Sequence, residues 1–331
     1  MKTRWWIGLA ALGTIAGLGV TVSILGNRAA AQRSLELERE SLLAETRHGA
    51  IEYVSWGRGP PVLVVHGAGG GFDQGRLLAE AVGGEASQFI SISRFGYLRS
   101  AMPSDASASA QAEAMLDLLD QLGIRQVSII AMSGGVPPAL KFAEMFPDRT
   151  DRMVLLSSAP FTPFSPQVDD RPIPTWAYSA LLGNDAAYWA LTKVAQRQLR
   201  GAFDARPELV MDLPPDELRF VDRLVNGFIP ASSRLAGVRN EGAAVDPATS
   251  YDLEAIRSPT LVAHSRDDRL NPFVIGEALV RRIPGSRLIA FGKGGHLLLG
   301  HHAQLRTEIA TFLGQNATST FAPARAGEAS D

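Results

Sequence analysis

Along most of the chain, short apolar runs alternate with stretches in which apolar residues recur every three or four positions. The apolar runs predict strands, and the amphipathic stretches predict helices. Strands are expected at residues 50–56, 61–67, 88–96, 125–132, 151–159, 258–265 and 286–291. Helices are expected at residues 107–124, 137–146, 272–283 and 303–313. Because strands that alternate with helices form crossover units, this order predicts an α/β fold with a mostly parallel central sheet and helices on both faces.

Residues 161–250 break this alternation. They carry no strand pattern and predict several helices joined by proline-rich turns. We expect them to form a helical cap inserted into a core made of residues 48–160 and 251–314. Aromatic residues of the cap are candidates for lining an acyl pocket, although aromatics at helical spacing more often form the core between helices. These aromatics are Trp176, Tyr178, Trp189, Phe203, Phe220 and Phe228.

The first 31 residues differ in character from the rest of the chain. Residues 5–25 carry no charge, and such a stretch is long enough to cross a hydrocarbon core of about 30 Å as a helix. Residues 1–31 are therefore expected to be a membrane anchor or, because Ala29 and Ala31 form a small-x-small cleavage pattern, a signal peptide. The catalytic body would then be membrane-anchored outside the cytoplasm, in a periplasmic or extracellular location, or secreted if residues 1–31 are cleaved.

Two further segments flank the predicted core. Residues 32–47 are charged, with a loose apolar stripe, and predict a stalk helix. Residues 315–331 are small and polar, with little to bury, and predict a disordered tail.

Composition limits the chemistry that the chain can perform. The 331 residues are 46% hydrophobic and 20% charged, which fits one globular domain with an insertion. A net charge of −2 offers no basic surface for phosphates, so nucleic acid is excluded as a partner. The chain has no cysteine, which excludes disulfides, thiolate nucleophiles and zinc sites built from cysteine.

One serine stands at a junction between a predicted strand and a predicted helix. In VSIIAMSGGVPPAL, residues 127–140, the apolar run ends just before Ser133, and two glycines and two prolines follow. Functional groups collect at the carboxyl ends of parallel strands. A sharp turn there crowds the positions two before and two after it, and Ala131 and Gly135 are small enough to permit the turn. The pattern therefore predicts a nucleophile elbow that exposes the Ser133 hydroxyl.

The elbow and two later segments together resemble the α/β-hydrolase family over roughly residues 46–313. The family pattern at the elbow is G-x-S-x-G, and A-M-S-G-G departs from it only in the first glycine. His296, in FGKGGHLLLGH after the last predicted strand, stands where the family has its catalytic base. For the catalytic acid, the resemblance aligns Asp268 in LVAHSRDDRLNPF, with Asp267 as the competing residue. The order of serine, acid and histidine along the chain is that of the family.

The resemblance also implies an oxyanion hole. Ala68, in the glycine-rich loop VVHGAGGGFDQG, and Gly134 would supply the two backbone amides. His66 in the same loop would shape the turn rather than act as a base, and His264 is expected at a strand edge or in a loop. No metal and no organic cofactor is implied.

These residues predict a serine hydrolase that cleaves a carboxylic ester or a related acyl bond through an acyl-enzyme intermediate. The expected substrate is a small molecule, and an apolar pocket beside a membrane anchor would suit a lipophilic acyl compound. Two alternatives stay open. The same triad could serve C–C bond hydrolysis, peptide hydrolysis, perhydrolysis or acyl transfer, or the chain could be a non-catalytic hydrolase-like binding protein.

Overall fold

The computed structural model describes residues 2–166, 181–246 and 248–314, and of residues 2–16 the backbone alone. Eight strands form one sheet in the order β1-β2-β4-β3-β5-β6-β7-β8. β2 pairs antiparallel with β1 and with β4, and the other neighbouring strands pair in parallel. The strands are β1 Leu42–Thr46, β2 Gly49–Gly57, β3 Pro61–Val65, β4 Gln88–Ile92, β5 Val127–Met132, β6 Thr150–Leu156, β7 Thr260–Ser265 and β8 Arg287–Phe291.

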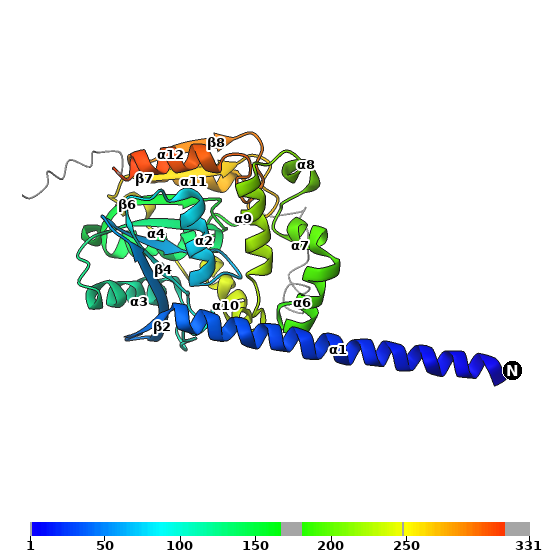
Figure 1. The fold of residues 1–331 in the computed structure, drawn as a ribbon. Coiled ribbons are helices and arrows are strands. Elements are labelled where there is room, and N and C mark those ends of the chain that lie inside the picture. The colour runs from blue at the N-terminus through cyan, green and yellow to red at the C-terminus, as the bar shows by residue number, and fades with distance from the viewer. Residues whose placement is uncertain (1, 167–180, 247, 315–331) are drawn as a thin grey trace, which may run out of the picture.

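Helices cover both faces of this sheet, and a further group of helices stands between β6 and β7 in the chain (Figure 1). The helices are α1 Lys2–Glu40, α2 Phe72–Val82, α3 Ala108–Gln121, α4 Val136–Met145, α6 Asp185–Val194, α7 Gln196–Ala202, α8 Pro207–Val210, α9 Pro215–Asn226, α10 Leu235–Asn240, α11 Val274–Arg282 and α12 His302–Phe312. Short 3-10 turns include η1 Ser133–Gly135 and η4 Glu241–Val245.

The core has two halves, one on each face of the sheet. Leu63 and Val65 of β3 pack with α3, α4 and α11, whereas Val62 and Val64 of the same strand pack with α2 and α12. Because both faces are covered, the central strands can be apolar at every position. The predicted α/β fold with a mostly parallel sheet is confirmed.

The edge of the sheet differs from the prediction. Residues 32–47, expected to form one stalk helix, instead divide between the end of α1 and strand β1. β1 forms a hairpin with β2 in which Thr46 lies opposite Gly49, and its Ala44 is buried. The segment LLAET has weak strand propensity, so its pairing with β2, rather than its own sequence, makes it a strand.

The described residues between Asp185 and Asn240 form helices α6 to α10, and we call this region the helical insertion. Its helix α9 packs against α2, where Phe220 contacts the cluster that contains Leu77. The fully buried Arg234 of the insertion pairs with Asp73 of α2 at 2.9 Å. This buried, paired charge attaches the insertion to the core, since leaving either partner alone would be costly.

The N-terminal segment also differs from the prediction. The uncharged residues 5–25 belong to α1, a helix of 39 residues that continues through charged sequence to Glu40. The first part of α1 extends away from the other elements, and its later part lies along the body (Figure 1). There Ala30 and Leu37 are buried, so this half of the helix uses its apolar side chains to pack on the protein.

Among the residues whose side chains the structure describes, which in α1 begin at residue 17, no helix combines the length and the apolar character needed to cross a membrane. This finding contradicts the predicted location, membrane-anchored outside the cytoplasm, and that prediction is wrong. The predicted tail, residues 315–331, lies outside the described residues.

The docking of α1 can be tested with two leucines of the same helix. Leu37 is 3% exposed and packs with Val54 and Phe72, whereas Leu35 is 54% exposed. We expect Leu37→Ala to lower the free energy of unfolding by about 2–4 kcal/mol, because it leaves a cavity between helix and sheet. Leu35→Ala should change it by less than about 0.5 kcal/mol. Equal effects in urea unfolding would contradict the docked position of α1.

Candidate active site

The candidate site begins at the end of β5, where Ser133 opens η1 and α4 follows directly. Ser133 has a φ of 52°, a left-handed conformation that is uncommon for residues other than glycine. A Cβ at Gly135 would collide with the carbonyl oxygens of Val65 and His66 at the end of β3. The structure therefore has the sharp strand-to-helix turn that the sequence predicted, and close backbone approach is why Gly135 must be small.

Two loops at the same edge of the sheet bring the predicted acid and base together. His296 Nδ1 lies 2.9 Å from Asp268 Oδ2. The other oxygen, Asp268 Oδ1, accepts backbone hydrogen bonds from Leu270 at 2.8 Å and Asn271 at 2.9 Å. Asp268 is buried, so these bonds fix the carboxylate and, through it, the imidazole ring.

The competing carboxylate, Asp267, has other partners. It forms an ion pair with Arg206 of the helical insertion, and its Oδ1 accepts a hydrogen bond from the Gly295 amide at 2.9 Å. Of the two neighbouring aspartates, Asp268 is therefore the one that contacts the His296 ring.

The electrostatics of the pair favour an ionised acid beside a basic histidine. Burial alone would raise the pKa of Asp268, but the charge of His296 and hydrogen bonds from His264 and His296 outweigh burial, and the pKa lies well below its usual range. Burial alone would lower the pKa of His296. Here the Asp268 carboxylate, helped by Asp204, outweighs burial and raises that pKa above its ordinary value of 6.5.

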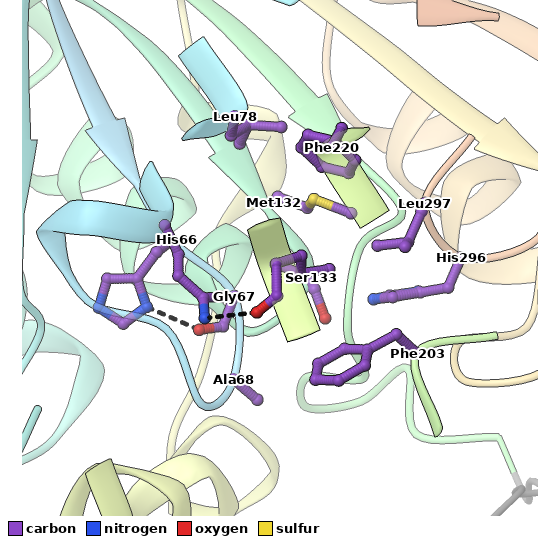
Figure 2. Close-up of a pocket in the computed structure, with 12 residues that line it drawn as sticks. His66, Gly67, Ala68, Leu78, Met132, Ser133, Phe203, Phe220, His296 and Leu297 are labelled. Atoms are coloured by element: carbon purple, nitrogen blue, oxygen red, sulfur yellow. Dashed lines mark hydrogen bonds between the residues drawn. The ribbon is translucent and has the colours of Figure 1, made fainter. Parts of the chain in front are cut away.

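Ser133 and His296 face each other across the site. Figure 2 shows the imidazole of His296 extending from its loop toward Ser133. The Ser133 Oγ accepts a hydrogen bond from Asn271 Nδ2 at 3.3 Å, and the same amide donates to the Ser157 carbonyl at 2.8 Å. Catalytic hydrogen bonds are often loose before a substrate binds. Asn271, which could not be singled out from the sequence, thus contacts the serine.

The glycine-rich loop after β3 lies over the elbow. A Cβ at Gly134 would stand 3.3 Å from the Ala68 amide nitrogen, so the two residues predicted to form the oxyanion hole are close neighbours. His66 in this loop is buried, and its Nε2 accepts a hydrogen bond from the Arg94 amide at 3.0 Å. Burial lowers the pKa of His66 well below its ordinary value, which suits a neutral ring that shapes the loop.

A small cavity of about 60 Å³ opens beside Ser133 and His296 (Figure 2). Its lining is mainly apolar and includes Phe203 and Phe220 from the helical insertion. Of the other aromatics predicted as candidates for the pocket, Trp189 and Phe228 pack in a cluster between the helices of the insertion, whereas Trp176 and Tyr178 lie outside the described residues. Among the described residues, no cluster of three or more histidine or acidic side chains could hold a metal ion.

The helical insertion also reaches the catalytic loops through a carboxylate that the sequence analysis missed. Asp204 Oδ2 accepts hydrogen bonds from the backbone amides of His296 at 3.0 Å and Arg269 at 3.1 Å. Arg206 stands 3.3 Å from the other oxygen of Asp204 and also pairs with Asp267. The insertion therefore positions the loop of the acid and the loop of the base at once. No local motif around Asp204 indicates this role.

Comparison with known proteins agrees with the fold. A family model described as "alpha/beta hydrolase fold" matches residues 60–303. The chain therefore belongs to the alpha/beta hydrolase fold family and is a hydrolase of that fold.

Three similar proteins illustrate the range of the family. A "2-hydroxymuconate semialdehyde hydrolase" of Pseudomonas putida is 29% identical over 280 residues, which cover 83% of this chain and 93% of that protein. The solved structure of an "alpha/beta hydrolase fold protein" from Nakamurella multipartita has a TM-score of 0.69 at 26% identity, covering 82% of this chain and 98% of that one. An esterase structure from Exiguobacterium antarcticum has a TM-score of 0.59 at 20% identity, covering 82% and 97%, and shares the fold.

The role of Asp204 yields a prediction for the pH dependence of turnover. A general base must be neutral, so kcat/KM should fall as the pH drops through the raised pKa of His296, above 6.5. Asp204→Asn removes a negative charge that raises this pKa, and the acid limb should therefore move to lower pH. Asp267→Asn changes a carboxylate that contacts the same loop, at Gly295, and should leave the limb in place. Equal shifts in the two pH profiles would contradict the role given to Asp204.

Proposed function

We propose that this chain is a serine hydrolase in which Ser133 is the nucleophile, His296 the general base and Asp268 the orienting acid. Neutral His296 takes the proton of Ser133 as the oxygen attacks a carbonyl carbon, and the amides of Ala68 and Gly134 stabilise the oxyanion. His296 then protonates the leaving group and activates water for deacylation. The observation that carries this proposal is the buried contact between His296 and Asp268 across from a strained elbow serine.

The bond that is broken is the finer question, and we infer that it is a carbon–carbon bond next to a carbonyl. The sequence alone predicts hydrolysis of a carboxylic ester, with C–C bond hydrolysis as an alternative. The Pseudomonas putida relative is named for 2-hydroxymuconate semialdehyde, a compound without an ester or amide. Hydrolysis of such a compound has to break a carbon–carbon bond, so this relative supports the alternative better than the ester.

The proposed triad can perform this chemistry without a further reactant. Ser133 adds to the carbonyl carbon, and collapse of the oxyanion breaks the neighbouring carbon–carbon bond. The substrate reacts as its 2-oxo tautomer, in which the electron pair of the broken bond is delocalised onto the 2-oxo group. The conjugated acid therefore leaves as a dienolate and takes up the proton that His296 received from Ser133. Water then releases the acyl group from Ser133 as a carboxylic acid.

Ester hydrolysis is the second candidate, and the apolar cavity supports it. Met132, Leu297 and the two phenylalanines of the insertion line a space beside Ser133 that suits an acyl chain. The insertion would then act as the cap that the sequence predicted over residues 161–250, and it would select the acyl group.

The two candidates separate in a direct comparison of substrates. We expect the purified protein to hydrolyse 2-hydroxymuconate semialdehyde with a higher kcat/KM than p-nitrophenyl butanoate, each followed by absorbance. Ser133→Ala should lower kcat/KM for both substrates by at least about 10³-fold, because it removes the nucleophile. A higher kcat/KM for the ester would favour the second candidate. Unchanged turnover in Ser133→Ala would contradict the proposed mechanism for both.

A further inference from the structure

A second carboxylate of the chain lies against the elbow. Glu241, at the start of η4 and directly after the helical insertion, pairs through Oε1 with Arg94 and with the hydroxyl of Tyr97. Its other oxygen lies so close to Gly134 that a Cβ there would collide with it. The same Cβ position is 3.3 Å from the Ala68 amide nitrogen. Glu241 therefore places a negative charge at the predicted oxyanion hole.

The donors that Glu241 contacts are fixed by the core. The Arg94 side chain is 4% exposed, and its Nε donates to the His66 carbonyl at 3.0 Å. The Tyr97 hydroxyl accepts a hydrogen bond from the Gly69 amide at 3.1 Å, which leaves its own proton for a carboxylate. Burial raises the pKa of Tyr97 well above its ordinary value, so the hydroxyl stays a donor. Two donors, one charged and one neutral, thus converge beside the elbow.

Glu241 itself is less firmly attached than these donors. Its side chain is 21% exposed, and it comes from a short 3-10 turn rather than from the sheet. A carboxylate beside Gly134 would also oppose the negative charge that develops on a substrate oxygen bound to that amide. We therefore expect a carbonyl that binds beside Gly134 to displace Glu241. Its departure would leave Arg94 buried and unpaired unless the substrate brings an anionic group of its own.

We propose that Arg94 and Tyr97 form a binding site for a carboxylate group of the substrate, and that Glu241 occupies this site when no substrate is present. A substrate carboxylate replaces Glu241 and restores the ion pair, whereas a neutral substrate displaces it without compensation. The site would thus select acids over neutral carbonyl compounds. This inference rests on the proposed function, because it gives the substrate class of the same serine site.

The test uses benzoate as a small carboxylate and benzamide as its neutral counterpart, both as competitive inhibitors of p-nitrophenyl butanoate turnover. Glu241→Gln removes the internal competitor, so benzoate should inhibit this variant at least about 10-fold more tightly than wild type. Benzamide should inhibit both proteins alike. Asp212→Asn, which removes an exposed carboxylate from the insertion, is the matched control. It should leave the inhibition constants of both benzoate and benzamide unchanged. The gain for benzoate should disappear when Tyr97→Phe is added to Glu241→Gln.

A second measurement does not depend on turnover. Benzoate should raise the thermal unfolding midpoint of Glu241→Gln more than that of wild type, and benzamide should not, because a ligand stabilises the state that binds it. This measurement remains informative if the variant is less stable or if the hydrolase proposal fails. Labelling of Ser133 by a fluorophosphonate reports the hydrolase proposal separately. Equal effects of benzoate on the two proteins, or a gain shared by benzamide, would overturn the carboxylate site.

Discussion

The buried hydrogen bond between His296 and Asp268 is the interaction on which the candidate site depends. It joins loops that follow β8 and β7, and it fixes which ring nitrogen faces Ser133. Because both groups are out of water, their charges act on each other strongly, lowering the pKa of the acid and raising that of the base. The parallel sheet makes this possible, since the carboxyl ends of β5, β7 and β8 meet at one edge.

The helical insertion also contacts the loops that carry His296 and Asp268. Asp204 accepts a hydrogen bond from the backbone amide of His296. Arg206 forms ion pairs with Asp204 and with Asp267, which lies in the loop of the acid. Just after the insertion, Glu241 lies against Gly134 of the elbow and pairs with Arg94. A movement of this region would therefore change the position of the base and the charge at the oxyanion hole together. We therefore expect substrate selection and catalysis to be coupled through these contacts.

The sequence could predict the parts of the site that follow from strand ends and small residues. Ser133 and His296 each stand just after an apolar run, and each lies where the α/β-hydrolase resemblance placed it. Strand β1 could not be predicted, because its pairing with β2 forms it. Asp204 and Glu241 could not be predicted either, because their partners lie 92 and 147 residues away along the chain.

The N-terminal prediction failed for a different physical reason. The uncharged residues 5–25 predict a helix that ends near residue 25, whereas they form the first part of a helix that continues to Glu40. The later part of this helix packs on the body through Ala30 and Leu37. An apolar run alone therefore did not reveal where the helix ends or what its second half contacts.

Covalent labelling can show whether His296 and Asp268 activate Ser133. The purified protein would be treated with a fluorophosphonate, digested, and searched by mass spectrometry for the modified peptide. We expect one modification, on Ser133, that is absent from Ser133→Ala and greatly slowed in His296→Ala. A folded wild-type protein that is not labelled, or that is labelled equally fast without His296, would contradict it.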